Sequence, residues 1–111
     1  MTIHRDLSSG KWFALSLVEQ MANIGTDLER YIRWSAKNMP IYSEPAFKRV
    51  LELIDLTVED PKNRNKLREI LRTRESLIDH FIYDNVYNTT LEQWRKYFYQ
   101  FNYAAAKVKG R

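Results

Sequence analysis

Residues 91–108 read LEQWRKYFYQFNYAAAKV, and this stretch decides the fold class. Apolar side chains recur in it at intervals of three and four residues, which is the period of an α-helix with one buried face. These side chains are Leu91, Trp94, Phe98, Phe101, Ala105 and Val108. Thr90 with Gln93, or Thr89 with Glu92, fits a capping box at the start of the segment. We therefore expect an amphipathic helix over residues 90–108.

Three earlier segments have the same helical period, and no segment has the sustained two-residue alternation of a half-buried strand. The pattern predicts helices over residues 9–37, 44–59 and 61–83. Ser8, Ser43 and Asp60 are the expected N-caps, in chain order. The short connections favour antiparallel neighbours. The expected fold is all-α, an up-down-up-down antiparallel four-helix bundle that forms a single domain over residues 1–111.

The composition excludes several classes of protein. The chain has 111 residues, 44% of them hydrophobic, which is enough for one core and excludes a wholly disordered protein. It has no Cys, which excludes disulfides and thiolate metal sites. No apolar run approaches the ~20 residues of a membrane span. The first residues carry no apolar segment of a secretory signal, so a cytoplasmic protein is expected.

The first expected helix is longer than the second. At 1.5 Å per residue, residues 9–37 would extend roughly 42 Å and residues 44–59 only ~24 Å. The apolar face of the longer helix then needs additional cover. The aromatic last helix, the N-terminal residues and a second copy of the chain are the candidates. On this basis we expect a homo-oligomer.

Arg74 lies at an inward position of the third expected helix, between Leu71 and Ile78. A charge there must be paired or must reach water, because an isolated buried charge costs several kcal/mol. In one interpretation Arg74 binds an anion in a pocket. In the simpler one it forms a structural ion pair, or its long side chain reaches the surface. The candidate acidic partners are Glu19, Asp27, Asp55, Glu75 and Asp79.

The same expected helix carries a basic ridge. Arg64, Arg68 and Arg72 follow one another at intervals of four residues, so they would share one face, with Arg74 nearby. Such a ridge can neutralise the phosphates of a nucleic acid. The net charge of +4 permits an anionic partner without requiring one, and Glu69 interrupts the patch. Nucleic-acid binding through this ridge is the alternative function.

Three tyrosines of the last helix, Tyr97, Tyr99 and Tyr103, fall outside its apolar stripe. Protein interfaces favour tyrosine, because it combines apolar area with a hydroxyl group. We therefore expect these residues to form a contact surface for a partner protein or for a second copy of the chain. They can also cover the first helix, and base stacking would use the same residue type.

The sequence contains no familiar catalytic pattern. It has no glycine-rich phosphate loop, no Glu-x-x-His pair for a di-iron site and no nucleophile elbow. We therefore assign no catalytic residue and expect no cofactor or metal. The expected function is that of a non-enzymatic binding or scaffold protein that acts through protein–protein contacts.

Residues 74–80, RESLIDH, resemble the Arg-x5-His spacing of HEPN-domain ribonucleases, which are helical bundles of similar size. That resemblance implies that Arg74 and His80 form a catalytic pair acting on RNA within a dimer. Residues six apart on a regular helix differ by about 240°, however, so the two side chains would diverge. The chain also resembles small prokaryotic four-helix-bundle proteins of uncharacterised function, and this second resemblance implies a fold and no activity. The segments that carry it are residues 20–30, 60–64 and 96–105.

Overall fold

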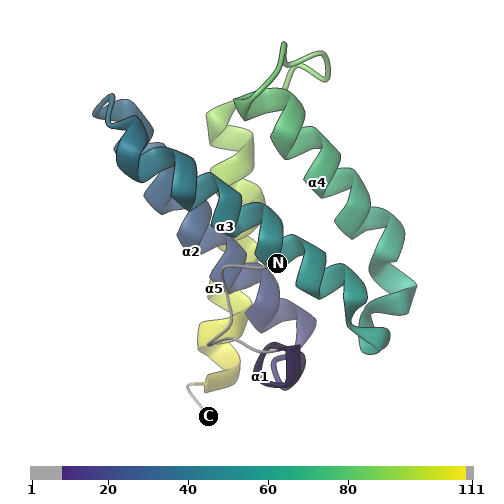
Figure 1. Ribbon diagram of the computed structural model, residues 1–111. Coiled ribbons are helices and arrows are strands. Elements are labelled where there is room, and N and C mark those ends of the chain that lie inside the picture. Colours follow the sequence, from purple (N-terminus) through teal and green to yellow (C-terminus); the bar gives the residue numbers. More distant parts are fainter. Residues whose placement is uncertain (1–8, 110–111) are drawn as a thin grey trace.

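The computed structural model describes residues 9–109, and this part of the chain is built from helices without any strand (Figure 1). The all-α fold class that the helical periodicity predicted is therefore confirmed. The elements are α1 (Ser9–Phe13), α2 (Leu17–Ala36), α3 (Pro40–Glu59), the 3₁₀ helix η1 (Pro61–Lys66), α4 (Leu67–Phe81) and α5 (Leu91–Lys109).

Helix α2 packs against both α3 and α5, and these three helices form the closely packed part of the fold. Gly25 lets α2 and α5 approach closely, since a Cβ added there would lie 2.8 Å from the Cβ of Phe98. Consecutive long helices run in alternating directions, and α4 diverges from α5 beyond the loop that joins them (Figure 1). Backbone contacts of α4 are mainly with α3 and η1. Core members include Ile24, Val50, Leu53, Ile54, Leu77 and Trp94.

The first predicted helix, residues 9–37, differs in the structure because the chain breaks into α1 and α2. Ser16 caps α2. Its Oγ accepts a hydrogen bond from the Glu19 backbone N–H (3.2 Å), and Glu19 Oε1 accepts one from the Ser16 backbone N–H (3.0 Å). The Ser-x-x-Glu pattern of a capping box was therefore present in the sequence. This capping box was not assigned from the sequence, because the apolar stripe continues through the break between α1 and α2. Ser8, the predicted cap, lies outside the described residues.

This break removes the expected mismatch in helix length. Helices α2 and α3 each have 20 residues, so each is roughly 30 Å long. Helix α1 packs against α3, where Trp12 is 1% exposed and its indole N–H donates to Thr57 Oγ1 at 3.0 Å. The apolar surface that had seemed to need a second copy of the chain is therefore covered within one copy.

Helix α3 begins at Pro40, before the predicted start at residue 44. Proline suits the first helical position, because its missing N–H would have no helical partner there. Ser43, the predicted cap, is instead a buried residue within the helix, and Pro45 also lies inside it. The prediction placed the helix start at Ser43 and Pro45, whereas Pro40 begins the helix in the structure.

Asp60 caps the next element, as predicted. Its Oδ1 accepts a hydrogen bond from the Lys62 backbone N–H at 3.1 Å. The chain then forms η1 rather than a regular α-helix, so that α4 starts only at Leu67 and ends at Phe81 instead of residue 83. Arg64 belongs to η1, which has about three residues per turn.

The last predicted helix agrees with α5, and its capping box is the one formed by Thr90 and Gln93. The Thr90 backbone N–H donates to Gln93 Oε1 at 2.8 Å, and the Gln93 backbone N–H donates to Thr90 Oγ1 at 3.1 Å. Local side-chain chemistry therefore determines where this helix begins.

A buried polar cluster ties α1, α2 and η1 together. The Gln20 amide donates to Asp60 Oδ2 at 2.8 Å and to the Trp12 carbonyl at 3.0 Å, and its Oε1 accepts from Asn63 at 2.8 Å. Lys62 pairs with the Asp60 carboxylate. Burial raises the pKa of Asp60, but the hydrogen bonds from Lys62 and Gln20 outweigh burial and hold that pKa below its usual value. The cluster anchors α1 to the rest of the fold.

Candidate functional site

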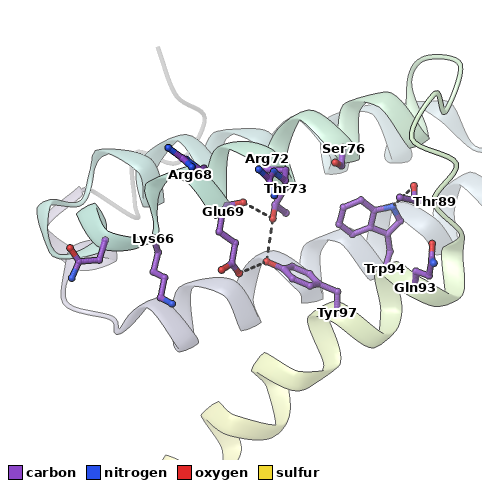
Figure 2. Close-up of a pocket in the computed structure, with 11 residues that line it drawn as sticks. Lys66, Arg68, Glu69, Arg72, Thr73, Ser76, Thr89, Gln93, Trp94 and Tyr97 are labelled. Carbon is purple, nitrogen blue, oxygen red and sulfur yellow. Dashed lines mark hydrogen bonds between the residues drawn. The ribbon is translucent and has the colours of Figure 1, made fainter.

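An open groove of about 680 Å³ lies between α4 and α5. Helix α4, with the end of η1, supplies a polar and charged wall, and α5 supplies Trp94 and Tyr97 (Figure 2). The lining residues are Asn65, Lys66, Arg68, Glu69, Arg72, Thr73, Ser76, Thr89, Gln93, Trp94 and Tyr97.

The groove exists because the side of α4 that faces α5 is polar. Glu69, Thr73, Ser76 and His80 recur at intervals of three and four residues, so they share one side of that helix. Such a stripe has no apolar side chains to interdigitate with Trp94 and Tyr97. The apolar side of α4, including Ile70 and Leu77, belongs to the core instead. The α4–α5 seam therefore stays open beside the Tyr97 hydrogen bonds.

Hydrogen bonds from Tyr97 cross the seam. Its hydroxyl donates to Glu69 Oε2 at 3.0 Å and lies 3.2 Å from Thr73 Oγ1 (Figure 2). Burial raises the pKa of Tyr97 to about 12; the hydrogen bond with Thr73 opposes this rise and the charge of Glu69 adds to it. At neutral pH the phenol is therefore protonated and donates hydrogen bonds. It is not ionised to the phenolate that could serve as a general base.

The loop between the two helices closes one end of the groove. Thr89 Oγ1 lies 2.9 Å from His80 Nδ1 and accepts a hydrogen bond from the Trp94 indole N–H at 3.2 Å. The Asn85 side chain bonds both the backbone N–H (3.0 Å) and the carbonyl (2.9 Å) of Thr89. Asn85 has a φ of 55°, a left-handed conformation that asparagine tolerates. The end of the groove is thus held by specific side-chain bonds.

The structure divides the predicted basic ridge. Arg68 and Arg72 line the groove together with Lys66, but Arg64 does not, because η1 alters the spacing before α4 begins. Among residues 9–109, none of Lys66, Arg68 and Arg72 forms a salt bridge. The cations of the groove are therefore available to an external anion.

Arg74 forms the ion pair of the simpler interpretation. Its Nε donates to Asp55 Oδ1 at 2.8 Å and its Nη2 to Asp55 Oδ2 at 3.4 Å, so the partner is one of the five candidates. The Arg74 side chain is 32% exposed, and it lines a different hollow, beside Leu71 and Ile78. His80, by contrast, bonds Thr89 at the end of the groove. Arg74 and His80 thus face different surroundings, as their angular separation on the helix predicts.

The three tyrosines predicted to form a contact surface differ in their burial. Tyr97 is half-buried and packs against the core within the seam. Tyr99 and Tyr103 are 64% and 58% exposed, and their ring centroids are 6.4 Å apart. Lys107 Nζ lies 5.7 Å from the centre of the Tyr103 ring. Only Tyr99 and Tyr103 therefore share the outer surface that the sequence suggested for all three.

Sequence reasoning missed the groove itself, including Glu69, Ser76 and Gln93. The polar residues at 69, 73, 76 and 80 were a usable signal, because a polar stripe on an otherwise well-formed helix marks a side that need not be packed. Comparison with protein-family models, with curated proteins and with solved structures gave no match.

The groove lining consists of cationic, hydroxyl, amide and aromatic side chains with the carboxylate of Glu69. Residues 9–109 contain no group of three or more His, Cys, Asp or Glu that could hold a metal ion. Within the same range, no helix has the length and apolarity that a membrane crossing requires. The groove combines cations, hydroxyl and amide groups, and an aromatic wall, which suits recognition of an anionic chain.

Proposed function

We propose that this chain is a non-enzymatic binding module that acts through protein–protein contacts, with the α4–α5 groove as the docking site. One observation carries the proposal. An open groove with an aromatic wall contains three cationic side chains, Lys66, Arg68 and Arg72, none of which pairs with another described residue. Aromatic residues and arginine are the side chains most enriched at the centres of protein interfaces.

The shape of the groove supports a chain-like partner over a small molecule. Small-molecule sites bury most of the ligand surface in a cleft or cavity, whereas this groove is open. We further propose that the four long helices form an up-down-up-down bundle whose α4–α5 seam stays open, and that the protein works in the cytoplasm.

Nucleic-acid binding is the alternative, and the unpaired Arg68 and Arg72 are the observation that favours it. One feature argues against it. Trp94 is only 7% exposed, so it offers no open ring face on which a base could stack.

A second proposal concerns self-association. The helix-length argument for a homo-oligomer no longer applies, since α2 and α3 match in length. The exposed pair Tyr99 and Tyr103 remains, and we propose that copies of the chain associate through this pair to form a homo-oligomer. Mass measurements of the native protein before and after replacing both tyrosines with serine test the idea. A single monomeric mass for the unchanged protein would refute it.

The docking proposal is tested by filling the groove. Ser76→Trp places an indole in the seam, and Ser35→Trp, at an exposed position near the end of α2, is the matched control. Each tagged protein is cross-linked in its host cell, purified, and its bound proteins are quantified. We expect proteins recovered with the unchanged chain and with Ser35→Trp to be lost with Ser76→Trp.

Two results would contradict the docking proposal. In one, Ser76→Trp keeps its helical circular dichroism and recovers the same proteins as the control. In the other, the bound material is nucleic acid that added salt removes, which would favour the alternative function.

A further inference from the structure

We infer that the α4–α5 groove accepts an extended, acidic segment of a partner protein, in which acidic and apolar residues alternate. This inference rests on the proposed function and names the chemistry of the partner. Three properties of the groove lead to it: the charge of its lining, the polarity of its α4 wall, and the spacing of Arg68 and Arg72.

The charge of the lining selects an anion. Lys66, Arg68 and Arg72 contribute positive charge, and Glu69 is the lining residue with a negative charge. The Glu69 carboxylate already accepts a hydrogen bond from Tyr97. The exposed guanidinium groups can therefore bind an external carboxylate, with which arginine can form two parallel hydrogen bonds.

The polarity of the walls favours an extended segment over a helix. A docked helix satisfies its own backbone and needs a continuous apolar surface to receive its apolar stripe. An extended segment instead presents unpaired N–H and C=O groups. The Ser76 hydroxyl and the Asn65 amide make no hydrogen bond to a side chain or backbone group of residues 9–109, so they are available to such a segment.

The spacing of the two arginines suits alternate residues of that segment. Arg68 and Arg72 are four residues apart on α4, a rise of ~6 Å. Alternate residues of an extended chain are ~6.6 Å apart and project to the same side. Two carboxylates in a Glu-x-Glu pattern would thus meet both arginines. The residue between them would face the opposite wall, where the half-buried ring of Tyr97 favours an apolar side chain.

The experiment uses two labelled peptides of identical composition and charge. Glu-Leu-Glu-Leu-Glu alternates acidic and apolar residues, and Glu-Glu-Glu-Leu-Leu does not. Labelled oligo-deoxythymidine is the nucleic-acid probe. Binding of each to the full chain is measured by fluorescence anisotropy. We expect the alternating peptide to bind at least tenfold more tightly than the rearranged peptide, and more tightly than oligo-deoxythymidine.

A pair of charge-matched variants locates the binding. Arg68→Gln with Arg72→Gln removes the two groove arginines, and Lys48→Gln with Arg64→Gln removes two exposed cations outside the groove lining. Both double variants lower the net charge equally. We expect the groove variant to weaken binding of the alternating peptide at least tenfold, and the control variant to weaken it less than threefold.

Several outcomes would overturn the inference: equal binding of the two peptides, equal loss in the two double variants, or tighter binding of oligo-deoxythymidine. A failure here is distinguishable from failure of the proposed function. If Ser76→Trp loses the cellular partners while the unchanged protein does not bind the alternating peptide, the groove is a docking site for a partner of different chemistry. If Ser76→Trp keeps those partners, the docking proposal itself is wrong.

Discussion

Helix α5 has two neighbours, and it meets them in different ways. Towards α2, Phe98 packs against the Gly25 backbone, and a groove of about 520 Å³ lined by both helices flanks that contact. Towards α4 it reaches across a groove, with Tyr97 hydrogen-bonded to Glu69 and Thr73. The same helix therefore has one seam with close backbone contact and one seam bridged by side-chain hydrogen bonds. The difference lies in the facing helix, because α2 presents an apolar stripe and α4 presents a polar one.

The largest expected effect contrasts the shared core of the fold with the α4–α5 seam. Leu53 is 1% exposed at the centre of the core, and Leu53→Ala should lower the free energy of unfolding by about 2–5 kcal/mol, because it removes buried contacts and leaves a cavity. Ser76→Ala in the open seam should change it by less than about 0.5 kcal/mol. Urea unfolding of both variants measures the contrast. Equal losses would mean that the seam is packed like the core.

A smaller effect on stability is expected at the buried polar cluster around Asp60. Asp60→Asn keeps the shape but removes the charge that pairs with Lys62, and should cost about 1–3 kcal/mol. Burial raises the pKa of Asp60, but hydrogen bonds from Lys62 and Gln20 outweigh it, so the folded-state pKa is lowered. The ionised Asp60 therefore stabilises the fold above the unfolded-state pKa of ~3.9, and this contribution is lost as pH falls through the lower folded-state value.

The direction of this pH dependence is tested by measuring the free energy of unfolding between neutral and acidic pH. The unchanged protein should lose stability below about pH 4 more steeply than Asp60→Asn. Parallel curves for the two proteins would show that Asp60 does not contribute to acid sensitivity.

The smallest effect is expected in the open seam. Tyr97→Phe removes the bonds to Glu69 and Thr73 and should cost about 0.5–1.5 kcal/mol. Because the pKa of Tyr97 is raised to about 12, the protonated phenol stabilises the fold below the unfolded-state value of ~10, and this contribution is lost as pH rises from there through the folded-state value. Absorbance of ionised tyrosine, followed with circular dichroism, should show a late transition that Tyr97→Phe lacks. If Tyr97 ionised at the same pH as the exposed tyrosines, its hydroxyl would not be buried in the seam.

Sequence reasoning succeeded where the determining chemistry is local. The Thr90–Gln93 capping box and the Asp60 cap depend on residues within three positions, and both are confirmed. Asp55 was among the partners considered for Arg74. The continuous helix over residues 9–37 failed, because an apolar stripe outweighed the Ser16–Glu19 capping box in the interpretation. Helical spacing does not show which neighbours are present, so it did not separate the half-buried Tyr97 from the exposed Tyr99 and Tyr103.

The sequence by itself determined the helical class, most helix boundaries and the segregation of apolar side chains, since these follow from periodicity and short-range capping. The tertiary structure alone decided which helix sides meet. It covered the apolar surface of α2 within one copy of the chain and left α4 and α5 apart. The physical reason is that apolar stripes from any helix can bury one another, so periodicity does not specify partners. A polar stripe on α4 has no apolar side chains to bury against α5, so the groove between the two helices stays open.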